Sequence, residues 1–265
     1  MPDQLDQQDP LGQLDRQGQR DQLDQSGRFF ILGDIHACPG ELEALLKALS
    51  LQTDDHVVCL GDYIDRGPDA KAVVDLLLGM RADKVCSFTF LKGNHEDMFL
   101  DFLGYGGLYG QAFLMNGGQQ TIASYNCDPL TPGDEIALAL PEVHREFFLG
   151  LKLLLPVDDI LCVHAGVNPG GSLDAQVTED LLWIREAFFS YPHDLPYTIV
   201  YGHTPRREVD FDVPYKVGID TGLVYGGKLS CLEITEKKLF QIERGRQRVT
   251  MADVEEYWAD GEPAD

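Results

Sequence analysis

Five apolar runs of this chain each end in a short motif that joins a glycine to a carboxylate, an amide or an imidazole. The motifs are GDIH at 33–36, GDYIDRG at 61–67, GNHE at 93–96, HAG at 164–166 and GHT at 202–204. Short apolar runs bounded by turn residues predict buried strands. In an open parallel sheet, ligands bind just beyond the carboxyl ends of the strands. The chain is therefore expected to bring five strand ends, with their polar side chains, to one rim.

Strand-like and helix-like runs alternate along the body of the chain. Apolar residues at helical spacing over 40–50 and 70–80 separate the first three strands, so 29–96 predicts a βαβαβ unit with parallel strands. A further amphipathic run predicts a helix over 179–189. The later segments KVGIDTG, GKLSCLEIT and KLFQIER alternate like antiparallel strands. The sequence thus predicts a mixed α/β protein with enough strands for two sheets.

The middle of the chain, 97–150, is predicted to be mostly helical and contains a glycine-rich patch, NGGQQT at 116–121. Its glycines make the backbone pliable. The segment is therefore expected to be either a movable cover over a cleft or an ordinary helical insertion.

The charge balance narrows the classes of partner. The 265 residues include 21 Lys and Arg against 44 Asp and Glu, a formal net charge of −23. Such acidity disfavours binding to nucleic acid or to an anionic membrane surface. The sequence also lacks an apolar run of about 18 residues, so no transmembrane helix is expected.

Composition also divides the chain into three parts. Residues 1–28 form an Asp/Gln-rich segment that is predicted to be a disordered tail, with one short amphipathic helix as the alternative. Residues 29–249 are predicted to be the folded domain that carries the strand-end motifs. Residues 250–265 carry six acids and no base, and are predicted to be an acidic C-terminal tail.

Six cysteines lie far apart without a CxxC pair, which predicts reduced thiols in a cytoplasmic protein rather than a zinc site or a disulfide framework. Three histidines lie outside the strand-end motifs and are predicted to be ordinary surface or loop residues: His56, His144 and His193.

The polar side chains at the strand ends suit a metal centre. Carboxylate and amide oxygens with imidazole nitrogens are ligands for manganese, iron or zinc. A single catalytic ion must keep an open position, so six ligands suit two ions about 3.5–4 Å apart that share a bridging carboxylate. Any one of these residues alone is more often a turn or cap residue, but five such strand ends together favour the metal centre. The six candidates are Asp34, His36, Asp62, Asn94, His164 and His203.

The same motifs, in this order and spacing, resemble the metallophosphoesterase superfamily. Within it they are most similar to the phosphoprotein phosphatase family, particularly its bacterial and phage-type serine/threonine phosphatases. The resemblance covers nearly all of 29–235. It implies a four-layer α/β fold, with two mixed central sheets flanked by helices and a di-metal centre at the rim.

The resemblance also assigns roles to individual metal ligands. Asp34 and His36 match the ligands of the first metal, and Asp62 matches the carboxylate that bridges both. Asn94 and two histidines match the ligands of the second metal, the histidines being His164 and His203.

Four further residues match the family's catalytic and phosphate-binding groups. His95 matches the general acid and Asp65 its orienting partner. Arg66 and Arg185 match two phosphate-binding arginines.

The sequence departs from the family pattern at two positions. Ala37 stands where the family usually has glycine, which raises the question of crowding in the first-metal loop. Lys92 stands where some phage-type members have arginine, and a lysine cannot give the bidentate fork.

These matches predict a metal-dependent serine/threonine protein phosphatase. A hydroxide activated by two divalent ions, manganese first and iron or zinc as alternatives, would attack phosphorus in line while His95 protonates the leaving alkoxide. The predicted substrate is a phosphoprotein or phosphopeptide, and the predicted location is cytoplasmic.

Two alternatives stay open. One is a dinucleoside polyphosphate hydrolase of the diadenosine tetraphosphate type, or another nucleotide phosphohydrolase. The presence of Asp65, and of Glu96 rather than Asp in the GNHE motif, is taken as favouring the phosphatase. The other alternative is a binding module without catalytic activity. The intact set of candidate metal ligands argues against it.

Overall fold

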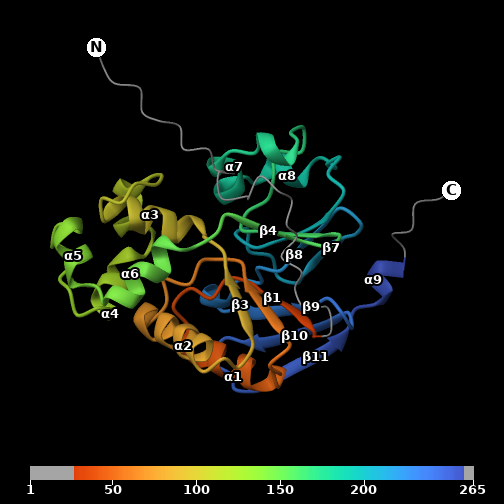
Figure 1. Ribbon diagram of the computed structural model, residues 1–265, viewed down its shortest axis with the longest axis horizontal. Helices are drawn as coiled ribbons and strands as arrows, with labels where there is room; N and C mark the ends of the chain where they lie inside the picture. The colour runs from red at the N-terminus through yellow and green to blue at the C-terminus, as the bar shows by residue number, and fades with distance from the viewer. Residues whose placement is uncertain (1–26, 260–265) are drawn as a thin grey trace, which may run out of the picture.

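The computed structural model describes residues 27–259, and within this range two central sheets are flanked by helices (Figure 1). This arrangement confirms the predicted α/β fold with two mixed sheets. The predicted N-terminal tail falls almost wholly outside the described residues. Arg28, at its end, is described, and its guanidinium pairs with Asp55 at 2.7 Å, so this residue belongs to the folded body.

The first sheet has six strands in the order β11-β10-β9-β1-β2-β3. β1 pairs in parallel with β2, and β2 in parallel with β3, as the alternation of strands and helices predicts. β9, β10 and β11 join on the other side of β1 as antiparallel strands. The strands span Phe29–Leu32 (β1), His56–Cys59 (β2), Ser87–Phe90 (β3), Lys228–Glu233 (β9), Lys238–Glu243 (β10) and Val249–Asp253 (β11).

The second sheet has five strands in the order β4-β5-β6-β8-β7. β5, β6 and β8 run parallel, while β4 and β7 are antiparallel edge strands. The strands span Leu154–Val157 (β4), Ile160–Val163 (β5), Thr198–Tyr201 (β6), Asp210–Asp212 (β7) and Lys216–Gly218 (β8).

Helices cover the outer faces of the two sheets, and four of them follow one another in the chain between β3 and β4 (Figure 1). They span Pro39–Leu49 (α1), Ala70–Ala82 (α2), Asn94–Phe102 (α3), Gly118–Ser124 (α4), Gly133–Ala139 (α5), Glu142–Leu149 (α6), Thr178–Trp183 (α7), Glu186–Phe189 (α8) and Glu256–Ala259 (α9). Four short 3₁₀ turns span Gly110–Ala112 (η1), Leu114–Asn116 (η2), Leu173–Ala175 (η3) and Leu223–Tyr225 (η4).

The side chains of β1 show how the layers are built. Phe30 and Leu32 pack into the core beneath α1 and α2, whereas Phe29 and Ile31 face the second sheet. A third cluster packs the far face of the second sheet against α7 and α8. The sheets therefore lie between two helical layers, and a strand buried on both faces explains the continuous apolar run FFIL.

Three expectations differ from the structure. The run 179–189 is not one helix but α7 and α8, because Ile184 is extended (ψ 142°) and Arg185 also leaves the helical region. The predicted acidic tail begins with β11, which pairs with β10, and Val254 after it is 3% exposed. The five polar strand ends come from two sheets, three from the first and two from the second, rather than from one open sheet. None of the described helices is long and apolar enough to span a membrane.

Candidate metal centre

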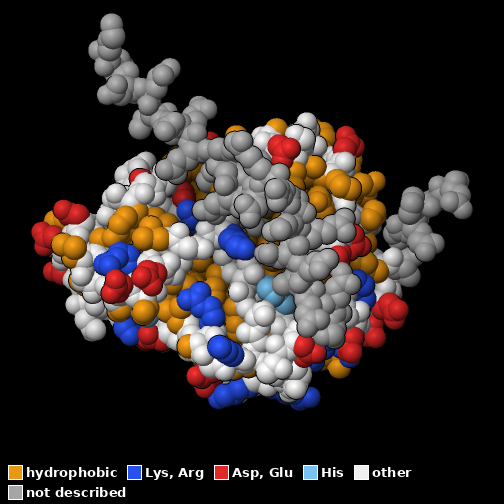
Figure 2. All heavy atoms as spheres, viewed as in Figure 1, with side chains coloured by type: hydrophobic (Ala, Val, Ile, Leu, Met, Phe, Trp, Pro, Cys, Tyr) orange, Lys and Arg blue, Asp and Glu red, His pale blue; other side chains and the backbone are white. Residues whose placement is uncertain are grey.

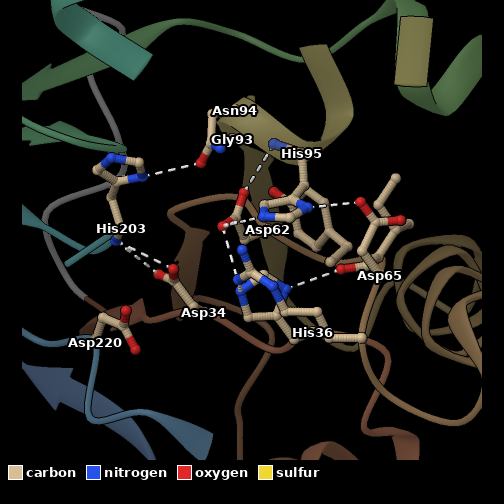
Figure 3. Close-up of polar contacts among 12 residues, drawn as sticks. Asp34, His36, Asp62, Asp65, Gly93, Asn94, His95, His203 and Asp220 are labelled. Atoms are coloured by element: carbon tan, nitrogen blue, oxygen red, sulfur yellow. Dashed lines mark hydrogen bonds and ion pairs between the residues drawn. The ribbon is translucent and has the colours of Figure 1, made fainter. Parts of the chain in front are cut away.

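The five strand-end motifs meet in one place. The loops after β1, β2 and β3 approach those after β5 and β6, and their polar side chains point toward one another (Figure 3). All six predicted ligands are at most 5% exposed. The three-residue clusters that can hold an ion share one member: His36, Asp62 and His95 form the first, and Asp62, His164 and His203 the second.

Asp62 lies between the two clusters. Its Oδ2 is 3.4 Å from His36 Nε2, and its Oδ1 is 3.4 Å from His164 Nε2. Burial alone would raise the pKa of Asp62, but the histidines around it hold it below its usual range; among them His95 has a raised pKa of its own, and the His95 backbone N–H donates to Asp62 Oδ1 at 3.2 Å. The side chain is thus an ionised carboxylate that faces both clusters, which is the position that a bridging ligand needs.

Two histidines are held in a defined tautomer. Nδ1 of His36 lies 3.0 Å from the Ile64 carbonyl, and Nδ1 of His164 lies 3.0 Å from the Leu60 carbonyl. A carbonyl only accepts, so each Nδ1 is the donor and each neutral ring keeps a lone pair at Nε2. The pKa of His36 is lowered to about 3, chiefly by burial, so its ring is neutral. This backbone support is the usual way in which a metal-binding imidazole is oriented.

The second cluster includes an amide. His203 Nδ1 lies 2.9 Å from Asn94 Oδ1 (Figure 3). His164 Nε2 lies 3.0 Å from the same oxygen. The backbone N–H of His203 donates to Asp34, at 3.1 Å from Oδ2, which joins the end of β6 to the end of β1. A Cβ at Gly202 would lie 2.1 Å from Asp34 Oδ1, so this approach requires glycine.

These residues fit a pair of divalent cations. Nε2 of His203 is buried and has no hydrogen-bond partner among the described residues. The lone pair at His164 Nε2 faces Asn94 Oδ1. Both atoms are acceptors, so they cannot bond each other, and a cation that both of them contact would stabilise the arrangement. The pKa of Asp34 is raised well above its usual range, by burial first and then by Asp220 and Asp62, so the site concentrates uncompensated negative charge.

Several residues of the centre have a left-handed backbone. His36 (φ 45°), Asp62 (φ 53°) and His203 (φ 65°) share this conformation, which side chains with a Cβ rarely adopt. Such strain persists only where surrounding contacts enforce it, and it clusters at functional sites. Ala37 belongs to this group, with φ 53°. Its left-handed conformation gives a physical reason why glycine is usual at this position, and its backbone N–H still bonds Tyr63 O at 2.8 Å.

His95 forms a supported pair with Asp65. Its Nδ1 is 2.6 Å from Asp65 Oδ2, and both side chains are at most 1% exposed. The hydroxyl of Thr121 donates to Asp65 Oδ1 at 2.5 Å and accepts from the Asp65 backbone N–H at 2.9 Å. Burial would lower the pKa of His95, but Asp62 and Asp65 raise it. Thr121 lies in α4, at the end of the glycine-rich patch, and sequence reasoning did not identify it.

Glu96 organises the backbone of the centre. Its two oxygens accept hydrogen bonds from the N–H groups of Asp62, Tyr63, Ile64 and Gly93, at 2.8–3.3 Å. Glu96 therefore holds the loop after β2 against the start of α3. The choice of Glu at this position reflects backbone packing, so it is not a guide to the substrate.

The predicted phosphate-binding arginines lie at the edge of the buried cluster. Arg66 Nη1 donates to His36 Nε2 at 2.7 Å. Arg185, at the N-cap of α8, is exposed and donates to Thr204 Oγ1 at 3.0 Å, beside His203. Lys92 instead pairs with Asp97 at 3.5 Å.

Asp220 is a further buried acid that sequence reasoning missed. It follows β8 in the segment GIDTG and lies near Asp34 and His203 (Figure 3). Its pKa is raised to about 6, mainly by burial, with the charge of Asp62 adding to the rise. Asp220 lies two residues after the end of β8, as Asp34 lies two residues after the end of β1, and Gly218 and Gly222 stand two positions to either side of it, so a signal was present in the sequence.

The three remaining histidines are buried rather than on the surface. His144 bonds the Tyr125 hydroxyl and Asp75, both at 2.9 Å, and His193 bonds the Tyr215 carbonyl at 2.8 Å. His56 bonds Thr89 Oγ1 at 3.0 Å. Burial is thus common to all seven histidines, and only convergence with other ligands distinguishes the four of the centre.

A buried set of carboxylate, amide and imidazole donors at converging strand ends of two mixed sheets defines a metal-dependent phosphoesterase. Residues 27–227 match the model of the calcineurin-like phosphoesterase family. The chain belongs to that family, which confirms the metallophosphoesterase resemblance.

Curated relatives are named asymmetrical bis(5'-nucleosyl)-tetraphosphatase PrpE. The protein from Oceanobacillus iheyensis is 28% identical over 239 residues, covering 80% of this chain and 90% of the relative. That from Geobacillus thermodenitrificans is 27% identical over 232 residues, covering 78% and 90%. That from Halalkalibacterium halodurans is 26% identical over 238 residues, covering 81% and 93%.

Solved structures support the fold. One protein, provisionally named a diadenosine tetraphosphatase, gives a TM-score of 0.64 at 23% identity and covers 83% of this chain and 95% of its own. A serine/threonine phosphatase from Saccharomyces cerevisiae gives 0.54 at 14% identity and covers 85% of this chain and 79% of its own. At these identities the likeness concerns the fold alone.

The relatives overturn two predictions. The predicted serine/threonine protein phosphatase activity is wrong, and so is the predicted phosphoprotein substrate. The error lies in the residues that were used to choose between substrates. Glu96 contacts the backbone, and Asp65 contacts His95 and Thr121. Neither side chain therefore indicates which group leaves phosphorus.

Proposed function

We propose that this chain is an asymmetrical dinucleoside tetraphosphatase, which cleaves a bis(5'-nucleosyl) tetraphosphate into a nucleoside triphosphate and a nucleoside monophosphate. The observation that carries the proposal is the match to relatives of that name over about four fifths of this chain and nine tenths of theirs. The intact, buried donor set supports an active enzyme rather than a silent binding module.

The proposal assigns two divalent cations to the centre. Asp34 and His36 would hold one, and Asn94, His164 and His203 the other, with Asp62 between them. Such a pair supplies an activated water and offsets the charge of the phosphate chain. Carboxylate, amide and imidazole donors without thiolates suit manganese, which is the cation proposed here.

The chain's own residues would bind and orient the polyphosphate. Arg66 and Arg185 present guanidinium groups at the edge of the centre, where they can donate to phosphate oxygens. His95, oriented by Asp65 and Thr121, would donate a proton from Nε2 to an oxygen of the phosphate chain. Its elevated pKa favours the protonated donor form.

The basicity of the leaving group determines how much proton donation by His95 contributes to the proposed reaction. A serine alkoxide is a strong base and needs a proton as it departs. A nucleotide phosphate is a much weaker base, because its second pKa is about 6. Under the present proposal His95 therefore acts mainly as a hydrogen-bond donor to developing negative charge, and protonation of the leaving oxygen contributes less.

The test is product analysis. The protein, loaded with manganese, is incubated with diadenosine tetraphosphate, and the nucleotides are separated by ion-exchange chromatography. Equal amounts of ATP and AMP are expected, and chelation of the metal should stop their formation. ADP as the sole product would mean symmetrical cleavage. No nucleotide product, with phosphoserine peptide hydrolysed by the same preparation, would contradict the proposal. The cytoplasmic location stays a prediction.

A further inference from the structure

Next to Arg66, one aromatic side chain is open to solvent. Tyr225 is the last residue of η4, in the turn between β8 and β9. It is 63% exposed, more than any other tyrosine of the described chain. The Cζ of Arg66 lies 5.5 Å from the centre of its ring, and the same guanidinium donates to His36. The ring is therefore separated from the metal centre by a single cationic side chain.

The turn that carries this ring is held firmly. Gly222 and Gly226 flank it with positive φ values of 69° and 91°, which glycine adopts without strain. Gly222 N–H donates to Asp220 Oδ1 at 2.9 Å, and Gly226 N–H donates to Leu223 O at 3.0 Å. Leu223 is 1% exposed and anchors the turn in the core. The exposed ring thus stands on a pre-organised support, which lowers the entropy cost of binding a ligand.

A second tyrosine near the centre is engaged differently. The ring of Tyr109 packs edge-on against Trp183, with centroids 5.1 Å apart, and its hydroxyl donates to Glu179. Trp183 in turn lies 6.1 Å from the ring of His203. Tyr109 is therefore tied to a neighbouring carboxylate, which disfavours a polyanion. Tyr225 is paired with a guanidinium, which favours one.

We propose that Tyr225 is the platform on which one nucleobase of the substrate stacks, with Arg66 binding the adjoining phosphates. This inference rests on the proposed function and adds to it a residue that distinguishes nucleotides from base-free phosphate esters. Every base has a π face, so stacking would accept different bases. A tyrosine also offers a large contact area with only two side-chain torsions to fix.

The experiment compares two substrates in three variants. The values of kcat and KM are measured on diadenosine tetraphosphate and on glycerol 2-phosphate, which carries neither a base nor any other aromatic ring. Tyr225→Ala is expected to lower the ratio of kcat/KM between the two substrates by about 5- to 150-fold, mainly through KM for the dinucleotide. Tyr225→Phe should restore the ratio, because it keeps the ring. Tyr191→Ala is the matched control, since Tyr191 is 62% exposed and outside the centre, and should leave both substrates unchanged.

An unchanged ratio in Tyr225→Ala would overturn the inference. This includes the case in which both substrates lose equally, because the ring would then only support Arg66. A wild-type protein that cleaves glycerol 2-phosphate but not the dinucleotide would instead overturn the proposed function. The stacking role is then decided by inhibition of glycerol 2-phosphate hydrolysis. Tyr225→Ala should weaken inhibition by AMP but not by inorganic phosphate, and equal weakening would overturn the role.

Discussion

The buried centre and the exposed rim of this protein differ in what holds them in place. In the centre, ligands are at most 5% exposed and are oriented by backbone carbonyls and N–H groups, as His36 is by Ile64. At the rim, Arg185 is exposed and Tyr225 is 63% exposed. Many contacts within the fold thus fix the positions of side chains in the centre, whereas the rim consists of a few exposed side chains. We infer that the centre supplies the phosphoester chemistry and the rim selects the substrate.

The charge of the surface is unevenly distributed. Acidic side chains gather near the edges of the view, over α5 and around β11, while several Lys and Arg side chains lie nearer its middle (Figure 2). A net charge of −23 therefore does not describe every part of the surface. An acidic protein can bind a polyanion where guanidinium groups and cations dominate locally.

The largest effect is expected from the residue shared by both clusters. Asp62→Asn removes the charge that faces His36 and His164, so both cations should bind more weakly, and activity should fall by more than about 100-fold. Elemental analysis after dialysis measures the metal content. Asp83→Asn, at an exposed position after α2, is the control. Two tightly retained ions in Asp62→Asn would break the distinction between centre and rim.

On diadenosine tetraphosphate a smaller effect is expected from His95→Asn, and its size should depend on the leaving group. The loss of kcat should approach about 10²–10⁴-fold on phenyl phosphate, because phenoxide is a base with a pKa near 10. The loss should be clearly smaller on diadenosine tetraphosphate, whose leaving group is a phosphate. Metal content should stay near normal, because the proposed function assigns the first cation to Asp34 and His36 and not to His95. Equal losses on both substrates would show that His95 does not respond to the leaving group.

The rim should give an intermediate loss. Arg185→Lys keeps the charge but removes the planar fork, so kcat/KM on the dinucleotide should fall by about 10- to 100-fold, the range for hydrogen bonds to charged groups. Arg246→Ala, at an exposed arginine paired with Glu243, should have no effect. Full activity of Arg185→Lys would show that the Arg185 guanidinium does not contribute to substrate binding at the rim.

The smallest effect is expected from Thr121→Val. The change removes the hydroxyl that donates to the Asp65 carboxylate and accepts from the Asp65 backbone N–H. The free energy of unfolding should fall by about 1–3 kcal/mol. Thermal unfolding measures this cost, and Thr250→Val on exposed β11 is the control. Because Thr121 acts through Asp65 on His95, the pH profile of kcat should also shift. A stability loss with an unaltered profile would limit Thr121 to a structural role.

Sequence reasoning predicted the α/β layers and selected six candidate ligands that the fold buries at converging strand ends, because both depend on local patterns. The metal-binding roles of these six residues stay predictions. A run such as FFIL needs two covering layers, and the glycine beside Asp34 leaves room for a close approach. The break between α7 and α8 was not predicted, because the run 179–189 keeps its apolar spacing across Ile184. Tertiary contacts also explain why Thr121 was missed, since its partner Asp65 is 56 residues away.

The substrate was predicted wrongly for a related reason. The motifs lie in the centre, where their side chains contact one another and the backbone, so they carry no information about the group that leaves phosphorus. Residues of the rim, such as Tyr225 and Tyr109, stand in turns whose position relative to the centre follows only from the fold.

The most direct measurement compares kcat/KM of the manganese-loaded protein on diadenosine tetraphosphate and on a phosphoserine peptide, in the same buffer. A centre of general phosphoester chemistry with a nucleotide-selective rim predicts a strong preference for the dinucleotide, cleaved to ATP and AMP. Equal values, or a preference for the peptide, would contradict the account.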